Sequence, residues 1–272
     1  MIRRSMEYPA DISGGGTLSW LEAGQGAPLV MLHGWSISGN VFTELAQQLS
    51  DEYRIFMPDL PGHGESTPLA QNTLASHGAV LSAWLRQEIA GPFSLLGWSL
   101  GGMLALALAD DHRLDVQRLA LLSATPRFSS DEEWSHGLPQ TQVKALIRNL
   151  RRRFEATLGD FFALTFAGEE ISDERMRQIR NFALRQSALP DKATAASLLE
   201  LFLDQDQRAL LDHLQLPTLV IHGELDQITP LAAGRYLAQQ LPDSRFVEIA
   251  GVGHAPFLSR PDSVAAAIKD FC

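Results

Sequence analysis

The stretch that decides the fold is FSLLGWSLGG, residues 93–102, which runs into MLALALA, residues 103–109. An apolar run, a Gly-x-Ser-x-Gly pattern and an alanine- and leucine-rich helical pattern predict a strand, a sharp turn and a helix. Gly97 and Gly101 flank Ser99 at a distance of two residues, where a Cβ would crowd so tight a turn. We therefore expect Ser99 to project above the edge of a sheet, where its hydroxyl can attack a carbonyl carbon.

The segments around this turn alternate between strand and helix patterns. Residues 18–21 and 28–32 are joined by a short, turn-rich link, which favours an antiparallel hairpin. The alternation that follows predicts an α/β fold with a mainly parallel sheet of the eight-stranded type and helices on both faces. The later strands are predicted at 53–57, near 93, and at 119–122, 218–221 and 245–249, and further helices at 42–49, 73–90, 231–241 and 263–271.

The alternation stops between residues 124 and 204, where the patterns are helical and no convincing strand is seen. A helical block that interrupts such an alternation is most simply a cap inserted over the edge of the sheet. A chain of 272 residues is long enough for one α/β domain with such an insertion. We predict a core of residues 1–123 and 205–272 and a helical cap of residues 124–204, inserted after the sixth strand.

Composition and charge narrow the classes of function. The chain is 45% hydrophobic and 20% charged, as in soluble globular proteins, and its net charge of −10 argues against nucleic-acid or anionic-membrane binding. One cysteine, Cys272, excludes an intrachain disulfide and a cysteine-rich metal site. No apolar run follows Arg3 and Arg4, so no signal peptide or membrane span is expected and the cytoplasm is the default location. No metal or other cofactor is predicted.

A catalytic serine needs a base to take its proton and an acid to orient that base. In open α/β sheets, sites form at the carboxyl ends of the strands. Asp226 follows the predicted strand at 218–221, and His254 follows the one at 245–249. We predict that they form a catalytic triad with Ser99, because the order Ser, Asp, His is that of α/β-hydrolases.

Each of these residues also has alternatives. Asp226 taken alone could be a turn residue, and His254 alone could be incidental. Glu224 is a competing acid, and His222 is a competing base that lies in the wrong loop for the expected order.

A second element of such a site is a pair of N–H groups that hold the oxyanion. The loop after the strand at 28–32 and the residue after Ser99 predict the backbone amides of Trp35 and Leu100 as these donors. We expect His33 to hold that loop rather than to act as a base. The turn-rich residues 59–66 are expected to brace the site.

These motifs resemble the α/β-hydrolase superfamily over essentially the whole chain outside the cap. Serine at the nucleophile position disfavours the relatives that use Asp, such as haloalkane dehalogenases and epoxide hydrolases. The matching segments are His33-Gly34-Trp35, Asp59-x-Pro61-Gly62-x-Gly64-x-Ser66, residues 97–102, Gly223-x-x-Asp226 and Gly253-His254.

A closer resemblance is to the pimeloyl-[acyl-carrier protein] methyl ester esterases of biotin synthesis. It is carried by residues 33–35, 97–102 and 254–261, and by shorter matches at 123–134 and 161–165. The resemblance implies a serine carboxylesterase that removes the methyl ester from a pimeloyl chain on an acyl-carrier protein. It also implies that a helix lining the acyl site contains Phe161, Phe162, Ala163, Leu164 and Thr165. About half of the apolar cap residues should instead form the cap's own core.

The cap is less acidic than the rest of the chain, since residues 127–185 hold ten basic and nine acidic side chains. Lys144, Arg148, Arg151 and Arg152 fall on one face of a helix, and Arg153 follows them. Such a face is either solvated or suited to an acidic carrier protein.

The family resemblance fits this carrier role only in part. Where the family has carrier-binding arginines, the chain has Ala156, Asp160 and Asp173, and only Arg177 matches. The candidate docking residues are therefore Arg148, Arg151, Arg152, Arg153 and Arg177.

The predicted function is hydrolysis of a carrier-bound pimeloyl methyl ester through an acyl-enzyme, with small esters as further substrates. The alternatives are a general short-chain esterase or a related hydrolase of C–C bonds, lactones or thioesters. A relative that binds a ligand without turnover is the alternative from another class.

Overall fold

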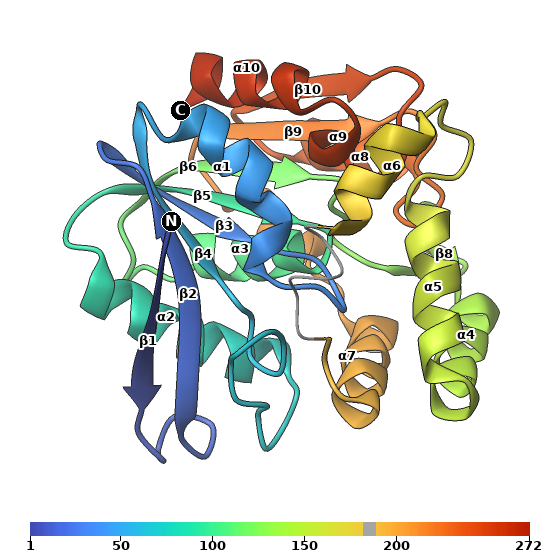
Figure 1. The fold of residues 1–272 in the computed structure, drawn as a ribbon, viewed down its shortest axis with the longest axis horizontal. Coiled ribbons are helices and arrows are strands. Elements are labelled where there is room, and N and C mark those ends of the chain that lie inside the picture. Colours follow the sequence, from blue (N-terminus) through green and yellow to red (C-terminus); the bar gives the residue numbers. More distant parts are fainter. Residues whose placement is uncertain (182–188) are drawn as a thin grey trace.

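The computed structural model describes residues 1–181 and 189–272 and is built around an eight-stranded sheet (Figure 1). The strand order is β1-β2-β4-β3-β5-β6-β9-β10, in which β1–β2 and β2–β4 are antiparallel and all other neighbours are parallel. The predicted mainly parallel sheet is confirmed. Its strands are β1 (Ile2–Tyr8), β2 (Gly16–Ala23), β3 (Ala27–Leu32), β4 (Tyr53–Pro58), β5 (Phe93–Trp98), β6 (Val116–Leu122), β9 (Thr218–Gly223) and β10 (Ser244–Ile249).

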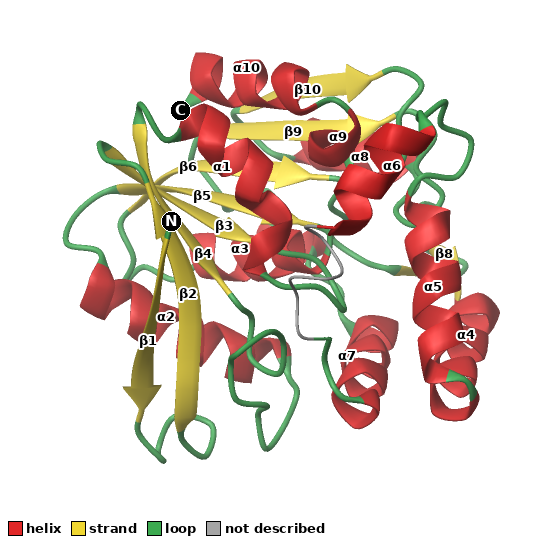
Figure 2. Cartoon of the chain, in the orientation of Figure 1, coloured by secondary structure: helices red, strands yellow, loops and turns green. Residues whose placement is uncertain are grey.

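Helices cover both faces of this sheet, as predicted (Figure 2). Alternate strand residues enter two separate apolar cores, with Val30 and Leu32 in one and Leu29 and Met31 in the other. Strands buried on both faces read as continuous apolar runs. One core contains α2 (Leu74–Glu88), α3 (Leu100–Ala109) and α8 (Leu231–Gln240), and the other contains α1 (Thr43–Leu49), α9 (Pro256–Ser259) and α10 (Pro261–Phe271).

The prediction of a hairpin between residues 18–21 and 28–32 is wrong. Strand β4 lies between β2 and β3, and β2 pairs with β1 and β4 instead. No pattern predicted β1, because this edge strand is largely exposed and its sequence, IRRSMEY, lacks a continuous apolar face.

Among the described residues, four α-helices lie between β6 and β9, beyond the carboxyl ends of the parallel strands (Figure 1). We call residues 124–204 the insertion. Helix α4 buries Val143, Ile147 and Leu150, which are spaced as one helical face. The expectation of no strand here is corrected by a two-residue pair, β7 (Ser129–Ser130) with β8 (Leu138–Pro139). The helices are α4 (Gln140–Arg152), α5 (Phe154–Thr165), α6 (Asp173–Arg180) and α7 (Lys192–Asp204), and the 3-10 helices η1 (Gly39–Phe42) and η3 (Arg208–Leu210) lie outside the insertion.

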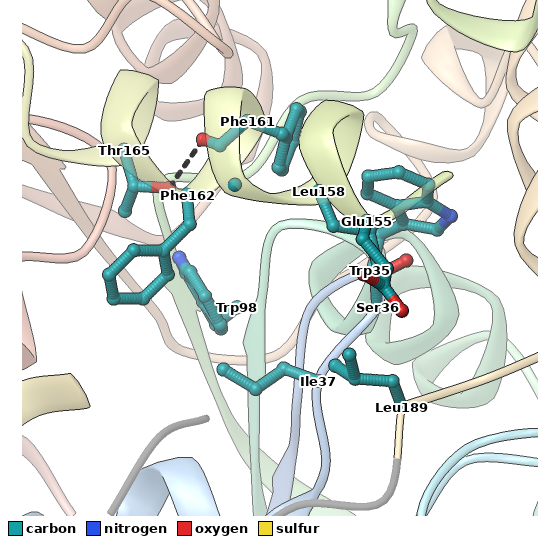
Figure 3. Close-up of a pocket in the computed structure, with 11 residues that line it drawn as sticks. Trp35, Ser36, Ile37, Trp98, Glu155, Leu158, Phe161, Phe162, Thr165 and Leu189 are labelled. Carbon is teal, nitrogen blue, oxygen red and sulfur yellow. Dashed lines mark hydrogen bonds between the residues drawn. The ribbon is translucent and has the colours of Figure 1, made fainter. Parts of the chain in front are cut away.

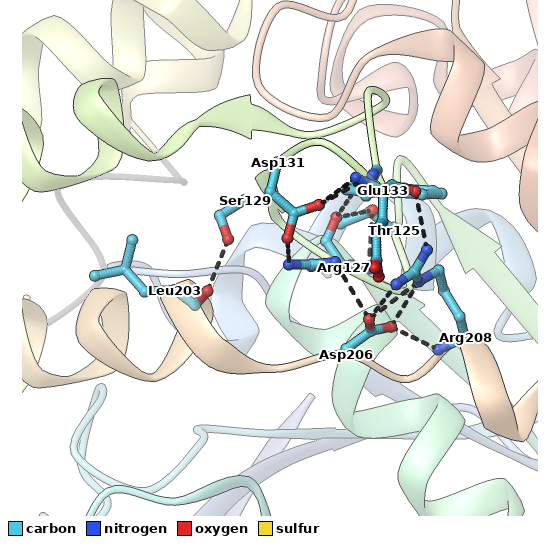
Figure 4. Close-up of polar contacts among 9 residues, drawn as sticks. Thr125, Arg127, Ser129, Asp131, Glu133, Leu203, Asp206 and Arg208 are labelled. Carbon is cyan, nitrogen blue, oxygen red and sulfur yellow. Dashed lines mark hydrogen bonds and ion pairs between the residues drawn. The ribbon is translucent and has the colours of Figure 1, made fainter.

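A polar network joins the two chain segments that connect the insertion to the sheet (Figure 4). Asp206 pairs with Arg208 at 2.6 Å and with Arg127 at 3.4 Å. The Ser129 hydroxyl donates to the carbonyl of Leu203 at 2.7 Å. The beginning and the end of the insertion are therefore held side by side.

Across residues 1–181 and 189–272, no helix combines the length and the apolar character that crossing a bilayer requires.

Candidate active site

Ser99 sits on a tight turn between the end of β5 and the start of α3. Its φ of +56° is unusual for a residue other than glycine and indicates a strained, specially held position. A Cβ on Gly97 would lie 2.2 Å from the Gly101 carbonyl oxygen, and one on Gly101 would lie 2.0 Å from that of Leu32. Both glycines are therefore required for the turn, which leaves Ser99 partly exposed.

The structure brings Asp226 and His254 together on the loops after β9 and β10. The His254 Nδ1–H donates to Asp226 Oδ2 at 2.8 Å, and both side chains are almost wholly buried. The other carboxylate oxygen, Oδ1, accepts the backbone N–H groups of Ile228 and Thr229, each at 2.9 Å. With the proton of the neutral ring on Nδ1, His254 Nε2 is left as the basic nitrogen.

Burial acts to raise the pKa of Asp226, since a charge is poorly solvated there. The charge of His254 and hydrogen bonds from His222 and His254 outweigh that effect and hold the pKa well below its usual range. Asp226 is therefore ionised at neutral pH and can stabilise a protonated His254.

Trp98 ties the nucleophile turn to the histidine loop. Its indole N–H donates to the His254 carbonyl at 2.8 Å, and the two rings lie 5.6 Å apart between centroids. Because Ser99 is the next residue, the serine and the histidine are held at the same edge of the sheet.

The predicted oxyanion donors belong to segments next to Ser99. Leu100 is the first residue of α3, and the first N–H groups of a helix have no partner within it. Trp35 follows Gly34, where a Cβ would lie 3.4 Å from that of Ser99. Backbone amides are thus available on both segments to bind a developing oxyanion.

Two buried histidines hold the loop that carries Trp35. His33 Nε2 accepts the N–H of Leu60 at 2.9 Å, and its Nδ1–H donates to the Gly34 carbonyl at 2.7 Å. His63 Nε2 accepts the N–H of Ser36 at 3.2 Å. Burial lowers the pKa of His33 to about 4 and that of His63 to about 3, so both are neutral and act as structural links between residues 33–36 and 59–66.

An apolar cavity of about 220 Å³ adjoins this edge (Figure 3). One wall is α5, which contributes Phe161, Phe162 and Thr165 from the predicted acyl segment. The structure places Ala163 on the exposed side of α5, and Leu164 lines a second cavity between α4 and α5. The remaining lining residues are Trp35, Ser36, Ile37, Trp98, Glu155, Leu158, Gly159 and Leu189.

The lining residues that were not predicted as binding residues are Ser36, Ile37, Trp98, Glu155, Leu158, Gly159 and Leu189. Glu155, Leu158, Phe162 and Thr165 recur at intervals of three or four residues, which is one face of a helix. That periodicity was the signal that separates them from Ala163.

A family model described as alpha/beta hydrolase fold matches residues 27–261. The chain belongs to the α/β-hydrolase family. Among curated proteins, it is 36% identical over 247 residues to the pimeloyl-[acyl-carrier protein] methyl ester esterase of Chromobacterium violaceum, covering 91% of this chain and 94% of that protein. It is 38% identical over 253 residues to the protein of that name from Aromatoleum aromaticum, covering 89% of this chain and 96% of that protein. The resemblance predicted from the motifs is confirmed.

Solved structures of other α/β-hydrolases share the fold. An esterase from Exiguobacterium antarcticum superposes with a TM-score of 0.87 at 24% identity, covering 94% of this chain and 96% of that one. A bromoperoxidase from Bacillus anthracis superposes with a TM-score of 0.88 at 21% identity, covering 98% of this chain and 99% of that one. Because both identities are below 25%, these two structures show only that the fold is shared.

The basic residues of this α/β-hydrolase are split between two places. Arg148, Arg151 and Arg152 lie exposed on α4, and Arg153 lies exposed at the turn into α5. Figure 1 shows α6, which carries the exposed Arg177, at the opposite end of α5 from that turn.

Ion pairs engage some of these side chains. Arg151 pairs with Glu200 of α7, and Arg153 lies 3.6 Å from Asp160. Arg148 and Arg152 form no ion pair with any residue that the structure describes.

Within the described parts of the chain, no three His, Cys, Asp or Glu side chains are grouped so that they would hold a metal ion.

Proposed function

We propose that this α/β-hydrolase is a serine carboxylesterase that hydrolyses the methyl ester of a pimeloyl chain carried by an acyl-carrier protein. The observation that carries the proposal is the buried 2.8 Å pair of Asp226 and His254, which Trp98 links to the turn that carries Ser99. Trp98 also lines the apolar cavity. The similarity to two esterases of that name, at 36% and 38% identity over about nine-tenths of the chain, supports the substrate class.

The reaction begins when the Ser99 oxygen attacks the ester carbonyl carbon and His254 Nε2 takes the serine proton. Asp226 orients the ring and stabilises the imidazolium, while the Trp35 and Leu100 amides bind the oxyanion, each worth about 3 kcal/mol. The intermediate collapses, the C–O bond to the methoxy group breaks, and His254 returns the proton so that methanol leaves. Water then attacks the acyl-enzyme with His254 again as base, and the products are the free carboxylate and Ser99.

The cavity suits a long chain held by its far end. Its wall on α5 runs from Glu155 to Thr165, which is about 15 Å at 1.5 Å per residue. At the inner end, the Thr165 carbonyl accepts the backbone N–H of His254 at 2.9 Å. An ester placed at that end leaves the rest of the chain along α5, so we propose the insertion, residues 124–204, as a substrate-binding cap on a core of residues 1–123 and 205–272.

We propose the turn between α4 and α5 as the carrier-docking surface. Arg148 and Arg152 lie on α4, and Arg153 lies at the turn itself. Glu155, at the outer end of the cavity wall, lies within the first turn of α5. Positive side chains there complement an acidic carrier and its phosphopantetheine phosphate. Arg177 lies away from this turn and is not needed for docking. A carrier-bound substrate also places the enzyme in the cytoplasm.

The test compares two methyl esters that share one reacting group. We expect methanol release from methyl pimeloyl-carrier protein to have a kcat/KM at least about tenfold above that for free monomethyl pimelate, since docking adds binding energy. A general short-chain esterase would favour small aryl esters and show no such difference. An organophosphonate should label Ser99 covalently in either kind of esterase. A relative that only binds a ligand need not hold an activated serine and so need not be labelled.

A further inference from the structure

Thr229 is bonded to the acid–base pair through its backbone N–H and its hydroxyl, and its carbonyl is bonded to the neighbouring His222. It lies three residues after Asp226 and is 1% exposed. Its N–H donates to Asp226 Oδ1 at 2.9 Å, and its carbonyl accepts a hydrogen bond from His222 Nε2 at 2.7 Å. Its hydroxyl lies 2.8 Å from Asp226 Oδ2, the oxygen that also binds His254.

The hydroxyl has one proton and two acceptors. Besides Asp226 Oδ2, it faces the carbonyl oxygen of Ser123 at 2.9 Å, and it lies 3.2 Å from His254 Nδ1. A carboxylate and a carbonyl can only accept, so the proton serves one of them at a time and a lone pair remains towards the Nδ1–H. Ser123 directly follows β6 and donates its own N–H to Ile221 at 2.8 Å. One hydroxyl therefore joins the end of β6, the acid loop and the base.

We propose that Thr229 is a positioning residue, whose hydroxyl fixes Asp226 Oδ2 against His254 Nδ1 and ties both to the end of β6. The proposal rests on the proposed function because it takes His254 as the base. Thr229 does not line the cavity, so it acts on the acid–base pair and not on the substrate.

The hydroxyl also sets how strongly the carboxylate favours a protonated His254. A donor on Asp226 Oδ2 offsets part of the negative charge that stabilises the imidazolium. The Thr229 hydroxyl lies 2.8 Å from Asp226 Oδ2 and 3.2 Å from His254 Nδ1. Because the carboxylate is nearer, the main effect of removing the hydroxyl is that Asp226 loses a hydrogen-bond donor. The other titratable groups near the carboxylate are His222, which lies 3.3 Å from Oδ2, and Glu169. Neither is bonded to the Thr229 hydroxyl.

The experiment compares Thr229→Val, which keeps the shape and loses the hydroxyl, with Thr229→Ser, which keeps the hydroxyl. Hydrolysis of p-nitrophenyl acetate is followed from about pH 5 to pH 9, which brackets the titration of a histidine base. In Thr229→Val we expect kcat to fall about tenfold, KM to change less than about twofold, and the acid limb of kcat/KM to move up by roughly half a pH unit. Thr229→Ser should keep kcat and the position of the acid limb near those of the wild type.

The control is Thr125→Val, which loses a buried hydroxyl bonded to the Arg127 carbonyl and touches no part of the triad. It should leave the acid limb where it is. Two results overturn the proposal: an unmoved acid limb with unchanged kcat in Thr229→Val, or equal impairment in Thr229→Ser, which would assign the role to packing. If Thr229→Val does not fold, Thr229→Ala takes its place against Thr229→Ser. A wild-type enzyme without ester hydrolysis would instead reject the proposed function.

Discussion

At the scale of single residues, Ser99 is held with a φ of +56° on a turn that needs glycine at positions 97 and 101. The order of Ser99, Asp226 and His254 could be predicted because each side chain follows its own strand. Thr229 could not be predicted, because a threonine three residues after an aspartate is an ordinary turn pattern and only the fold brings it to His254. The order of the motifs along the chain therefore predicts Ser99, Asp226 and His254, but not Thr229, whose contacts depend on the fold.

Replacing the nucleophile tests the assignment of Ser99. Ser99→Ala should lose ester hydrolysis by about four to six orders of magnitude, since no other group supplies the attacking oxygen. The strained backbone at φ +56° remains, so thermal unfolding should stay near that of the wild type. Measurement of kcat together with the melting temperature checks both, and substantial activity in a folded variant would remove Ser99 from the mechanism.

Gly97 tests the turn itself. A methyl group placed 2.2 Å from the Gly101 carbonyl must displace the backbone, so Gly97→Ala should lower both the melting temperature and kcat. Gly78→Ala, in α2, is a matched control, because a Cβ there meets nothing within 4 Å and the residue does not line the cavity. Wild-type stability in Gly97→Ala would show that the turn is looser than described.

At the scale of elements, the insertion is bonded directly to the loop that carries His254. The Thr165 carbonyl at the end of α5 accepts the N–H of His254 at 2.9 Å, and Glu169 Oε1 accepts that of Gly253 at 2.8 Å. Sequence patterns predicted helices here but not this contact, since it joins residues more than 80 positions apart. The same limit explains the wrong hairpin, because a short link does not show that β4 inserts between β2 and β3.

Glu169 should support the histidine loop through its hydrogen bond to Gly253. Glu169→Ala leaves that N–H without its partner, at a cost of about 1–3 kcal/mol, and should lower kcat more than it raises KM. Glu169→Gln keeps an acceptor oxygen and should retain most activity. Steady-state kinetics of the two variants check this, and equal loss in both would point to the charge rather than the hydrogen bond.

The buried histidines should make stability fall in mild acid. Unfolded histidines bind protons below about pH 6.5, whereas burial lowers the pKa of His33 to about 4 and those of His63 and His77 to about 3. The unfolded state therefore binds more protons, and the free energy of unfolding decreases as the pH falls from 6.5 towards 4. Denaturant unfolding at a series of pH values measures the slope, which His77→Gln should reduce. A flat profile over that range would contradict the neutral, buried state.

At the scale of the whole molecule, a basic turn lies on a chain with a net charge of −10. The cluster on α4 could be predicted from its helical spacing. Its separation from Arg177 could not, because that depends on how α5 and α6 pack. The charge pattern fits an acidic partner that approaches the outer end of the cavity.

Charge reversal tests that docking surface. Arg148→Glu with Arg152→Glu breaks no ion pair among the described residues, so the fold should be kept. We expect kcat/KM on the carrier conjugate to fall at least about tenfold, with less effect at high salt, and that on a small aryl ester to stay unchanged. Arg177→Glu is the matched control and should leave both unchanged. Equal loss on both substrates would reject a docking role.

The central claim is tested most directly by the mass of the acyl-enzyme. Attack of Ser99 on the methyl ester joins the enzyme to the whole carrier conjugate, with loss of methanol, because the pimeloyl chain stays bound to the carrier at its other end. Acid quenching during turnover, followed by intact-protein mass spectrometry, should show this adduct in the wild type and not in Ser99→Ala. An adduct that lacks the carrier would mean that the thioester is cleaved instead, and would contradict the account.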